Sequence, residues 1–164
     1  MRRIFPKGCI LDVGCGFGRL LKVLPPGSVG VDHNIDMVGA ARLRGLDVVD
    51  TTAFGQRFHA SGACFDGLLC AHMVEHLTAQ QGHEILSGYL TKLRPGSKVL
   101  LITPQARGYR ADPTHLSYYN LAALMEFADR LGLQEIEGIS YPFPEWAGSW
   151  FTYNENIVTA RIVD

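Results

Sequence analysis

The chain has 164 residues and a net charge of −1 at pH 7, and 47% of its residues are hydrophobic against 19% charged. This is enough apolar material for one core, so we expect a single domain over residues 1–164. The basic residues are scattered, which argues against a nucleic-acid partner. No apolar run approaches the length of a membrane span and no signal peptide is recognised, so we expect a cytoplasmic protein without membrane contact.

Strand and helix signals alternate from residue 8 to about 132, which is typical of an α/β fold. We predict strands at 9–13, 28–32, 46–50, 65–71 and 98–103, and helices at 17–24, at 35–44, from Thr78 to the Leu93–Gly96 turn, and from Asn120. Two further strands, near 133–140 and 155–163, follow without a helix between them and should pair antiparallel. The sequence therefore predicts a single doubly wound, mostly parallel seven-stranded sheet (Rossmann-like) with an antiparallel C-terminal hairpin.

The first strand leads directly into a turn with three alternate glycines, Gly14, Gly16 and Gly18. Without a Cβ at these positions, the backbone can take unusual dihedrals and a ligand can touch the main chain. The spacing is GxGxG, whereas a dinucleotide fingerprint would have its third glycine at position 19, which is Arg19. The next strand closes with an acid, Asp32. This turn is predicted to bind a cofactor, and its glycine spacing opposes a nicotinamide.

This pattern resembles the class I S-adenosylmethionine-dependent methyltransferases of the small-molecule type, over nearly the whole chain. The resemblance implies S-adenosyl-L-methionine as cofactor, with Asp32 on the ribose hydroxyls and Asp12 near the ammonium. It also implies adenine contacts from Asp50 and Thr51, and backbone carbonyls toward the ammonium from Cys70 and Ala71. The implied cofactor-binding residues are Asp12, Gly14, Cys15, Gly16, Gly18, Asp32, His33, Asp50, Thr51, Cys70 and Ala71.

Three of these acids also have purely structural interpretations. Asp12 can cap the glycine turn from the end of its strand, Asp32 can cap the helix at 35–44, and Asp50 can belong to a turn. The four cysteines, Cys9, Cys15, Cys64 and Cys70, form no CxxC pair, so buried free thiols are the simplest interpretation.

The segment His72-Met73-Val74-Glu75-His76 matches the HxxEH pattern of some zinc enzymes, in which both histidines share one helical face. Here the pentapeptide begins where the strand 65–71 ends, and the next helix starts only near Thr78. Methyltransferases similar to this chain often carry a Glu-His-Leu triplet at this place, which Glu75-His76-Leu77 reproduces. We therefore expect no metal ion.

Methyl transfer from a sulfonium is an in-line displacement whose leaving group departs neutral. Positioning the acceptor can supply about 7 to 11 kcal/mol, whereas a general base contributes about 10²- to 10⁴-fold. The candidates for a catalytic base are His72 and His115, the latter in a long loop after the strand 98–103. For His115, the simpler role of pinning that loop to the following helix stays open.

The acceptor is predicted by elimination to be a small molecule. Nucleic-acid amino-methylases of this family place Asp or Asn, two prolines and an aromatic residue after the fourth strand, whereas this chain reads Cys70-Ala71-His72-Met73. An aromatic segment over 141–153 either walls an apolar pocket or covers the last hairpin. The sequence does not name the acceptor or its reacting atom.

Relatives usually carry one or two helices before the first strand that cap the cofactor, and only residues 1–8 stand there in this chain. We therefore expect the loops at 104–119 and 141–153, a second copy of the chain or a partner subunit to close the site. The alternative is a catalytically weak or inactive S-adenosylmethionine-binding subunit that acts with a partner. A nicotinamide oxidoreductase is the third possibility.

Overall fold

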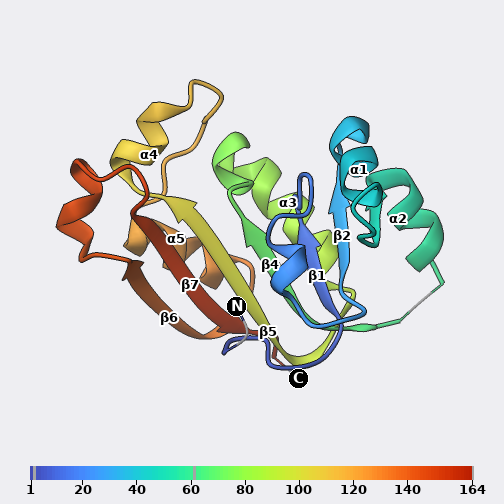
Figure 1. The fold of residues 1–164 in the computed structure, drawn as a ribbon. Coiled ribbons are helices and arrows are strands. Elements are labelled where there is room, and N and C mark those ends of the chain that lie inside the picture. The colour runs from blue at the N-terminus through green and yellow to red at the C-terminus, as the bar shows by residue number, and fades with distance from the viewer. Residues whose placement is uncertain (2, 61, 164) are drawn as a thin grey trace.

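The computed structural model describes residues 1, 3–60 and 62–163. Within these residues seven strands form one sheet in the order β3-β2-β1-β4-β5-β7-β6 (Figure 1). The strands are β1 (Ile10–Val13), β2 (Val29–Asp32), β3 (Val48–Asp50), β4 (Phe65–Ala71), β5 (Leu93–Pro104), β6 (Gln134–Tyr141) and β7 (Glu155–Arg161). The first five pair in parallel, and β7 lies antiparallel between β5 and β6. The predicted seven-stranded, mostly parallel sheet with an antiparallel end is confirmed.

Helices cover both faces of this sheet (Figure 1). They are α1 (Ile35–Arg42), α2 (Thr51–Phe58), α3 (Ala79–Leu90), α4 (Ala106–Ala111) and α5 (Leu121–Arg130), with short 3-10 helices η1 (Leu21–Val23), η2 (Val74–His76) and η3 (Glu145–Ser149). The predicted starts of three helices are confirmed by side-chain caps from Asn34, Thr78 and Asn120. Each of these oxygens accepts a backbone N–H that has no partner within the helix.

Some predicted elements were wrong. The helix predicted at 17–24 is a turn followed only by η1, because Gly18 has φ +80° and two prolines at 25 and 26 stop the segment. Helices α2 and α4 were not predicted. The turn predicted at Leu93–Gly96 lies in β5, since Leu93 pairs with Phe65 and is buried.

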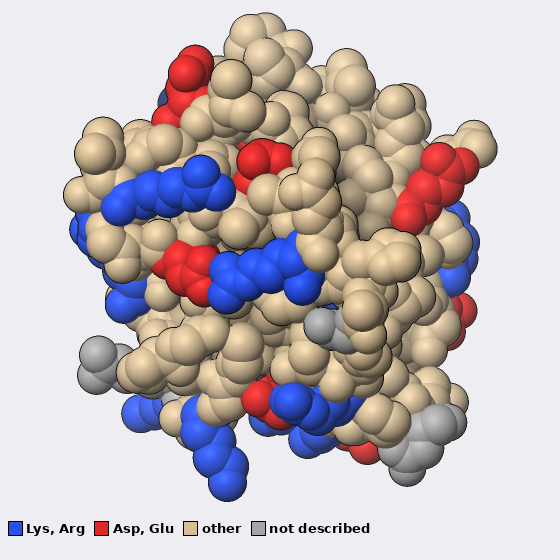
Figure 2. Space-filling view, turned by 90° about the vertical axis from the view of Figure 1, so that its right-hand side faces the viewer, with Lys and Arg blue, Asp and Glu red and all other residues tan. Residues whose placement is uncertain are grey.

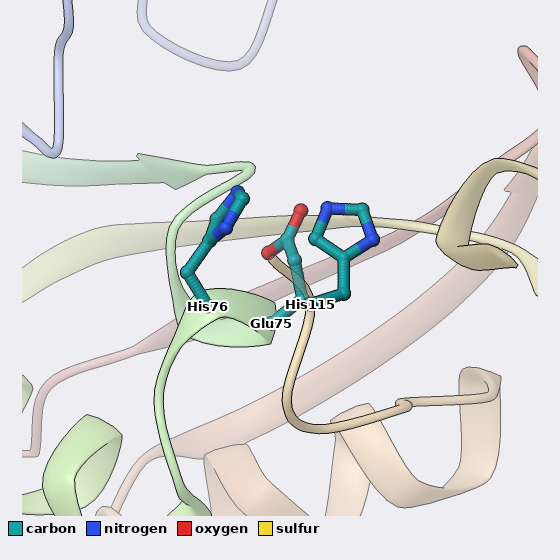
Figure 3. Close-up of side chains that lie close together, drawn as sticks. All are labelled: Glu75, His76 and His115. Atoms are coloured by element: carbon teal, nitrogen blue, oxygen red, sulfur yellow. The ribbon is translucent and has the colours of Figure 1, made fainter. Parts of the chain in front are cut away.

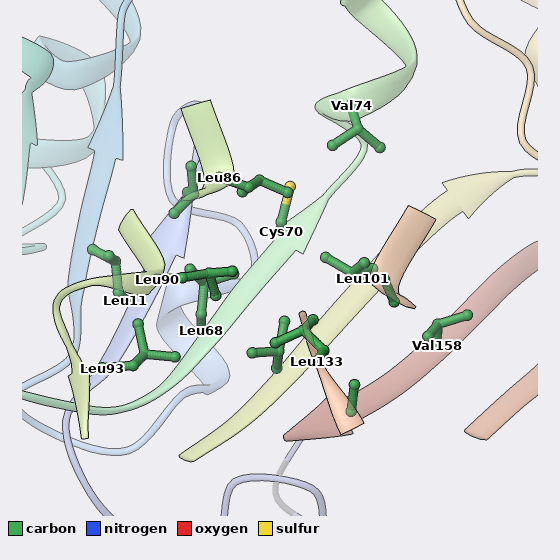
Figure 4. Close-up of a cluster of buried hydrophobic side chains, with 14 of the residues drawn as sticks. Leu11, Leu68, Cys70, Val74, Leu86, Leu90, Leu93, Leu101, Leu133 and Val158 are labelled. Carbon is green, nitrogen blue, oxygen red and sulfur yellow. The ribbon is translucent and has the colours of Figure 1, made fainter. Parts of the chain in front are cut away.

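The core consists of two layers on either side of the sheet. One layer packs α3 and α5 onto the sheet, with side chains such as Leu68, Leu86 and Leu101 (Figure 4). The other packs α1 and η1 onto residues such as Ile10 and Leu69. Strand residues therefore alternate between the layers while both faces stay buried, which explains the continuous apolar runs in the sequence.

The carboxyl ends of the parallel strands meet at one edge of the sheet. At this edge the backbone N–H groups of Gly14 and Cys15 both donate to the carbonyl of Val31, at 2.9 and 3.2 Å. The N–H of His72 donates to the carbonyl of Ile102 at 3.0 Å. These bonds place the glycine turn, the end of β2 and the segment after β4 next to one another. Ligands of open α/β sheets bind at this edge.

On the face at the α1 and α2 end, basic and acidic side chains are interspersed among uncharged ones (Figure 2). Arg57 and Asp47, for example, pair at 2.6 Å. Among the described helices, none has the length and apolar character of a membrane span.

Candidate functional site

Two adjoining cavities open at the carboxyl edge of the sheet. The smaller, of about 290 Å³, lies against the glycine turn and the end of β4. The larger, of about 560 Å³, extends from the turn across the ends of β2 and α3. Gly14 and His72 line both cavities. The larger cavity is lined by Val13, Gly14, Val31, Asp32, His33, Thr51, His72, Met73, His76, Leu77, Ile85, Tyr89 and Thr114.

The glycine turn presents bare main chain to these cavities. Gly14 and Gly16 both have positive φ, at +71° and +53°. A Cβ built on Gly14 would lie 2.5 Å from Cγ of Met73, so a larger residue does not fit there. A Cβ on Gly16 would meet nothing within 4 Å, so this stretch of backbone is open to close approach by a ligand.

Asp32 holds the turn in place from the end of β2. Its Oδ2 accepts the N–H of Gly16 at 2.7 Å, and its Oδ1 accepts the N–H of Asn34 at 2.9 Å. The side chain is buried and lines the larger cavity. Because each carboxylate oxygen has two lone pairs, both retain one acceptor position for a ligand. Helix α1 is capped by the side chain of Asn34 instead.

Asp12 is a buried carboxyl that lacks a complete set of partners. Only 2% of the residue is exposed, and its Oδ2 has no hydrogen-bond partner. Burial, together with the nearby negative Asp32, raises the pKa of Asp12 to about 8. The residue lines the smaller cavity beside Gly14 and Ala71. A cationic group entering this cavity would satisfy the orphaned oxygen.

The remaining predicted cofactor residues divide into those that line the cavities and those that do not. Thr51 and His33 line the larger cavity, and Cys15, Gly16 and Ala71 line the smaller one. Asp50 lines neither, because its side chain accepts the N–H of Ala53 at 2.9 Å and caps α2. Gly18 and Cys70 are likewise absent from both linings, and the thiol of Cys70 packs into the core.

His72 lies between two carboxylates. Its Nε2 is 2.8 Å from Glu155 Oε1, and its Nδ1 is 3.4 Å from Glu75 Oε1. The hydrogen bond to Glu155, together with the nearby carboxylate of Glu75, raises the pKa of His72 to about 9 against the opposing effect of burial. The backbone at this residue is in the left-handed region with φ +55°, which is unusual for a non-glycine residue. Both ring nitrogens are engaged, so His72 is better suited to hold charge than to accept a proton.

His115 lies behind the wall of the larger cavity instead of lining it. Its ring stacks on Tyr109, with centroids 5.3 Å apart, and meets His76 edge-on at 4.6 Å. His76 and Thr114 are the neighbours that reach the cavity. Figure 3 shows Glu75, His76 and His115 pointing toward one another from η2 and the loop after α4. Sequence interpretation missed Glu75 and His76 as site residues, although the Glu-His-Leu triplet marked their place.

The comparisons with known proteins agree with this geometry. Residues 2–137 match a family model described as a methyltransferase domain. The chain belongs to this methyltransferase family. A search of curated proteins finds no match.

Solved structures of methyltransferases share the fold of this chain. An S-adenosylmethionine-dependent methyltransferase from Archaeoglobus fulgidus aligns with a TM-score of 0.75 at 23% identity, covering 97% of this chain and 88% of that one. Phosphoethanolamine N-methyltransferase 2 from Haemonchus contortus, in complex with S-adenosyl-L-methionine, gives 0.70 at 16% identity, covering 99% and 51%. A methyltransferase from Haloferax volcanii in complex with the activator Trm112 gives 0.71 at 15%, covering 96% and 82%.

S-Adenosylmethionine is named for the Archaeoglobus and Haemonchus structures, so it is the cofactor to compare with the site of this methyltransferase. Its own residues fit that cofactor. The orphaned oxygen of buried Asp12 suits a cation, and the open main chain at Gly16 suits close packing of a ligand. Asp32 retains acceptor positions at the edge of the larger cavity. The fit is carried by these three features, which arise from the glycine turn and the strand ends on either side of it.

Proposed function

We propose that this methyltransferase transfers the methyl group of S-adenosylmethionine to a small-molecule acceptor. The observation that carries the proposal is the continuity of the site. The larger cavity includes Asp32 of the cofactor end and also His76, Leu77 and Thr114, which stand beyond the end of β4. Its volume of about 560 Å³ lies within the roughly 300–1,000 Å³ range of small-molecule sites.

The cofactor end of the site is assigned to Asp12, the turn from Gly14 to Gly18, and Asp32. When bound there, S-adenosylmethionine supplies an electrophilic methyl group on a sulfonium. Asp12 provides a carboxylate for the ammonium, and Asp32 provides acceptors for the ribose hydroxyls. His33 and Thr51 lie on the rim of the same cavity and are assigned to the adenosine side.

The acceptor end is assigned to the wall beside His76, where Met73 and Leu77 give an apolar lining. An apolar wall with a few polar groups orients a small molecule and excludes water from it. Holding the acceptor in line with the methyl group can lower the barrier by about 7 to 11 kcal/mol. The charged His72, fixed by Glu155, stands between the two ends and can donate a hydrogen bond only by rearranging one of its carboxylate contacts.

The loops after β5 and β6 support the rim of the site. Arg107 Nε donates to Thr152 Oγ1 at 3.1 Å, so the two loops are in contact. Inside them, Nδ2 of the fully buried Asn154 donates to Gln105 Oε1 at 2.9 Å. We assign closure of the acceptor side to the first of these loops, because Thr114 within it lines the larger cavity.

A second candidate is a catalytically weak cofactor-binding subunit that works with a partner. The observation that favours it is the exposure of aromatic side chains around η3, with Trp146 68% and Tyr153 76% exposed. Such a patch is typical of a protein contact. The Haloferax relative is itself held in a complex with an activator.

The test combines ligand-induced stabilisation with turnover. S-Adenosylhomocysteine at 100 times its dissociation constant should add about 2.7 kcal/mol of stability, while NADH should add none. Asp32→Ala should abolish this shift, and Asp36→Ala, an exposed acid in the first turn of α1, is the matched control. Turnover of labelled donor with a metabolite extract supports the enzyme. Cofactor binding without turnover supports the subunit, and a chain stabilised by NADH alone contradicts both.

A further inference from the structure

We propose that Glu75, His76 and His115 form a binding site for a divalent transition-metal ion at the acceptor end of the cavity. One ligand atom from each of the three residues lies within 4.8 Å of the other two. Two imidazoles and one carboxylate are a donor set used by catalytic zinc sites, which keep a further position open. The proposal rests on the proposed function for its role, since the open side faces the acceptor.

The buried carboxyl of Glu75 points to a cationic ligand. The residue is 1% exposed, and neither of its side-chain oxygens has a hydrogen-bond partner among the described residues. Its ion-pair partner is His72, whose Nδ1 lies 3.4 Å from Oε1 while its Nε2 is 2.8 Å from Glu155, so one imidazolium is shared between two carboxylates. A buried carboxylate without hydrogen bonds is costly unless a cation neutralises it.

Hydrogen bonds set the tautomer of His115. Its Nδ1 lies 2.8 Å from the carbonyl oxygen of Tyr109, which can only accept, so Nδ1 carries the proton. Nε2 therefore keeps an unshared lone pair. A ring held by a backbone carbonyl in this way is the usual arrangement of a metal-binding histidine.

The tautomer of His76 follows from a chain of two hydrogen bonds. The hydroxyl of Thr114 donates a hydrogen bond to Asp112 Oδ1 at 2.6 Å, so its only proton is already used. Thr114 Oγ1 must then accept from His76 Nδ1, which is 3.0 Å away. Nε2 of His76 therefore also keeps its lone pair.

The backbone holds the two halves of the site together. The N–H groups of Leu116 and Ser117 both donate to the carbonyl of Glu75, at 2.7 and 3.0 Å. Ser117 Oγ donates to the carbonyl of Leu77 at 2.6 Å. The loop that carries His115 is thus fastened to η2, which carries the other two ligands (Figure 3).

Ion binding requires only a small contraction of this cluster. Ligands at about 2.1 Å from a tetrahedral zinc ion are about 3.4 Å from one another. His76 lines the larger cavity, so the open position of the ion would face the acceptor and take one of its oxygen or nitrogen atoms. Imidazole ligands favour zinc and its neighbours in the first transition row over magnesium. This proposal replaces the sequence expectation of no metal, which considered only the pair His72 and His76.

The first test is calorimetric titration of zinc chloride into untagged, chelator-treated protein, with magnesium chloride as the control. We expect one zinc ion per chain and no binding of magnesium. Protein that binds S-adenosylhomocysteine but no zinc overturns this proposal and leaves the proposed function in place. Protein that binds zinc but no S-adenosylhomocysteine supports this proposal and contradicts the proposed function.

The second test assigns the ligands. Glu75→Gln and His115→Gln should each weaken zinc binding at least about 100-fold. Substitutions of residues that only contact metal ligands weaken metal binding by up to about 100-fold, and loss of a ligand itself should cost no less. His59→Gln, at the exposed C-terminal end of α2, is the matched control. His115→Gln remains informative if Glu75→Gln does not fold, and S-adenosylhomocysteine binding reports on folding. Unchanged zinc affinity in a folded His115→Gln protein contradicts the site, as does a zinc site that depends on His72 and not on His115.

Discussion

Asp12 gives the sharpest test of the cofactor site, because its protonation is linked to binding. Burial and the nearby Asp32 raise its pKa to about 8, so in the free protein the carboxyl is mostly protonated at pH 7. The ammonium of the cofactor or its product favours the carboxylate form. Binding of S-adenosylhomocysteine should therefore release a proton, and its affinity should increase with pH.

The size of this effect follows from the pKa. A group with a pKa of about 8 is about 1% ionised at pH 6, about 9% at pH 7 and about 50% at pH 8. If only the ionised form binds tightly, the dissociation constant falls about ninefold from pH 6 to 7 and about fivefold from pH 7 to 8. In Asp12→Asn this dependence should disappear, and the affinity should stay at the weak level of the protonated protein.

The stability of the free protein should also depend on pH through Asp12, but it should decrease with increasing pH whereas the affinity increases. The pKa of Asp12 in the folded state lies above its value of about 3.9 in the unfolded state, so between these values the folded state binds more protons. The contribution of Asp12 to stability is therefore fully present below about pH 4 and is lost as the pH rises through about 8. S-Adenosylhomocysteine should remove most of this loss, and Asp12→Asn should lack it.

The assay is isothermal titration of S-adenosylhomocysteine at pH 6, 7 and 8 in the wild-type and Asp12→Asn proteins. His72 lines the same cavity and also titrates, so His72→Gln is included as a control. It should keep the pH dependence, because Asp12 is unchanged in it. A wild-type affinity that does not change between pH 6 and 8 refutes the reasoning. An equal slope in Asp12→Asn refutes it too, because another group would then carry the linkage.

Other substitutions test the scaffold around the site. Asp32→Ala should destabilise the protein by about 1–3 kcal/mol in urea unfolding, since the amide of Gly16 loses its acceptor. Leu124→Ala, at a fully buried position under the sheet, should cost about 2–5 kcal/mol in the same assay. Asn156→Ala should cost about 1–3 kcal/mol, because the carbonyl of Tyr119 loses the buried amide donor and Nε2 of Gln105 loses one of its three acceptors. Burial raises the pKa of the Cys15 thiol, so this cysteine should react with a disulfide reagent at pH 8 far more slowly in folded than in urea-unfolded protein.

The sequence predicted those parts of the fold that depend on local signals. The capping box that opens α3 at Thr78 and the cap of α5 at Asn120 need only neighbouring residues, and both are confirmed. Helix α2 was missed because it is only eight residues long, contains Thr51, Thr52 and Gly55, which have low helix propensity, and begins directly after β3. Its cap, Asp50, was interpreted as a cofactor residue, since the same acid type serves both purposes at the end of a strand.

The polar network beneath the last loops was beyond prediction from sequence. Gln105, Asn154 and Asn156 are almost completely buried, although such side chains are usually exposed. They satisfy one another over about 50 positions of sequence, for example Gln105 Nε2 to Asn156 Oδ1 at 2.9 Å. Only the antiparallel placement of β7 beside β5 brings them together. Residue types alone do not show that these side chains are buried together.

The proposed metal site shows how a local backbone conformation changes the meaning of a motif. In an α-helix the two histidines of HxxEH share one face, but here His72 has φ +55° and turns toward Glu155 before η2 begins. The tighter 3-10 turn that follows places Glu75 inward beside His76. The third ligand, a second imidazole nitrogen, then comes from His115, which reaches the cluster only because its loop is bonded to the carbonyl of Glu75. The segment 72–76 therefore does not form the helical zinc site that HxxEH suggests, but it supplies Glu75 and His76 as two ligands of the proposed site.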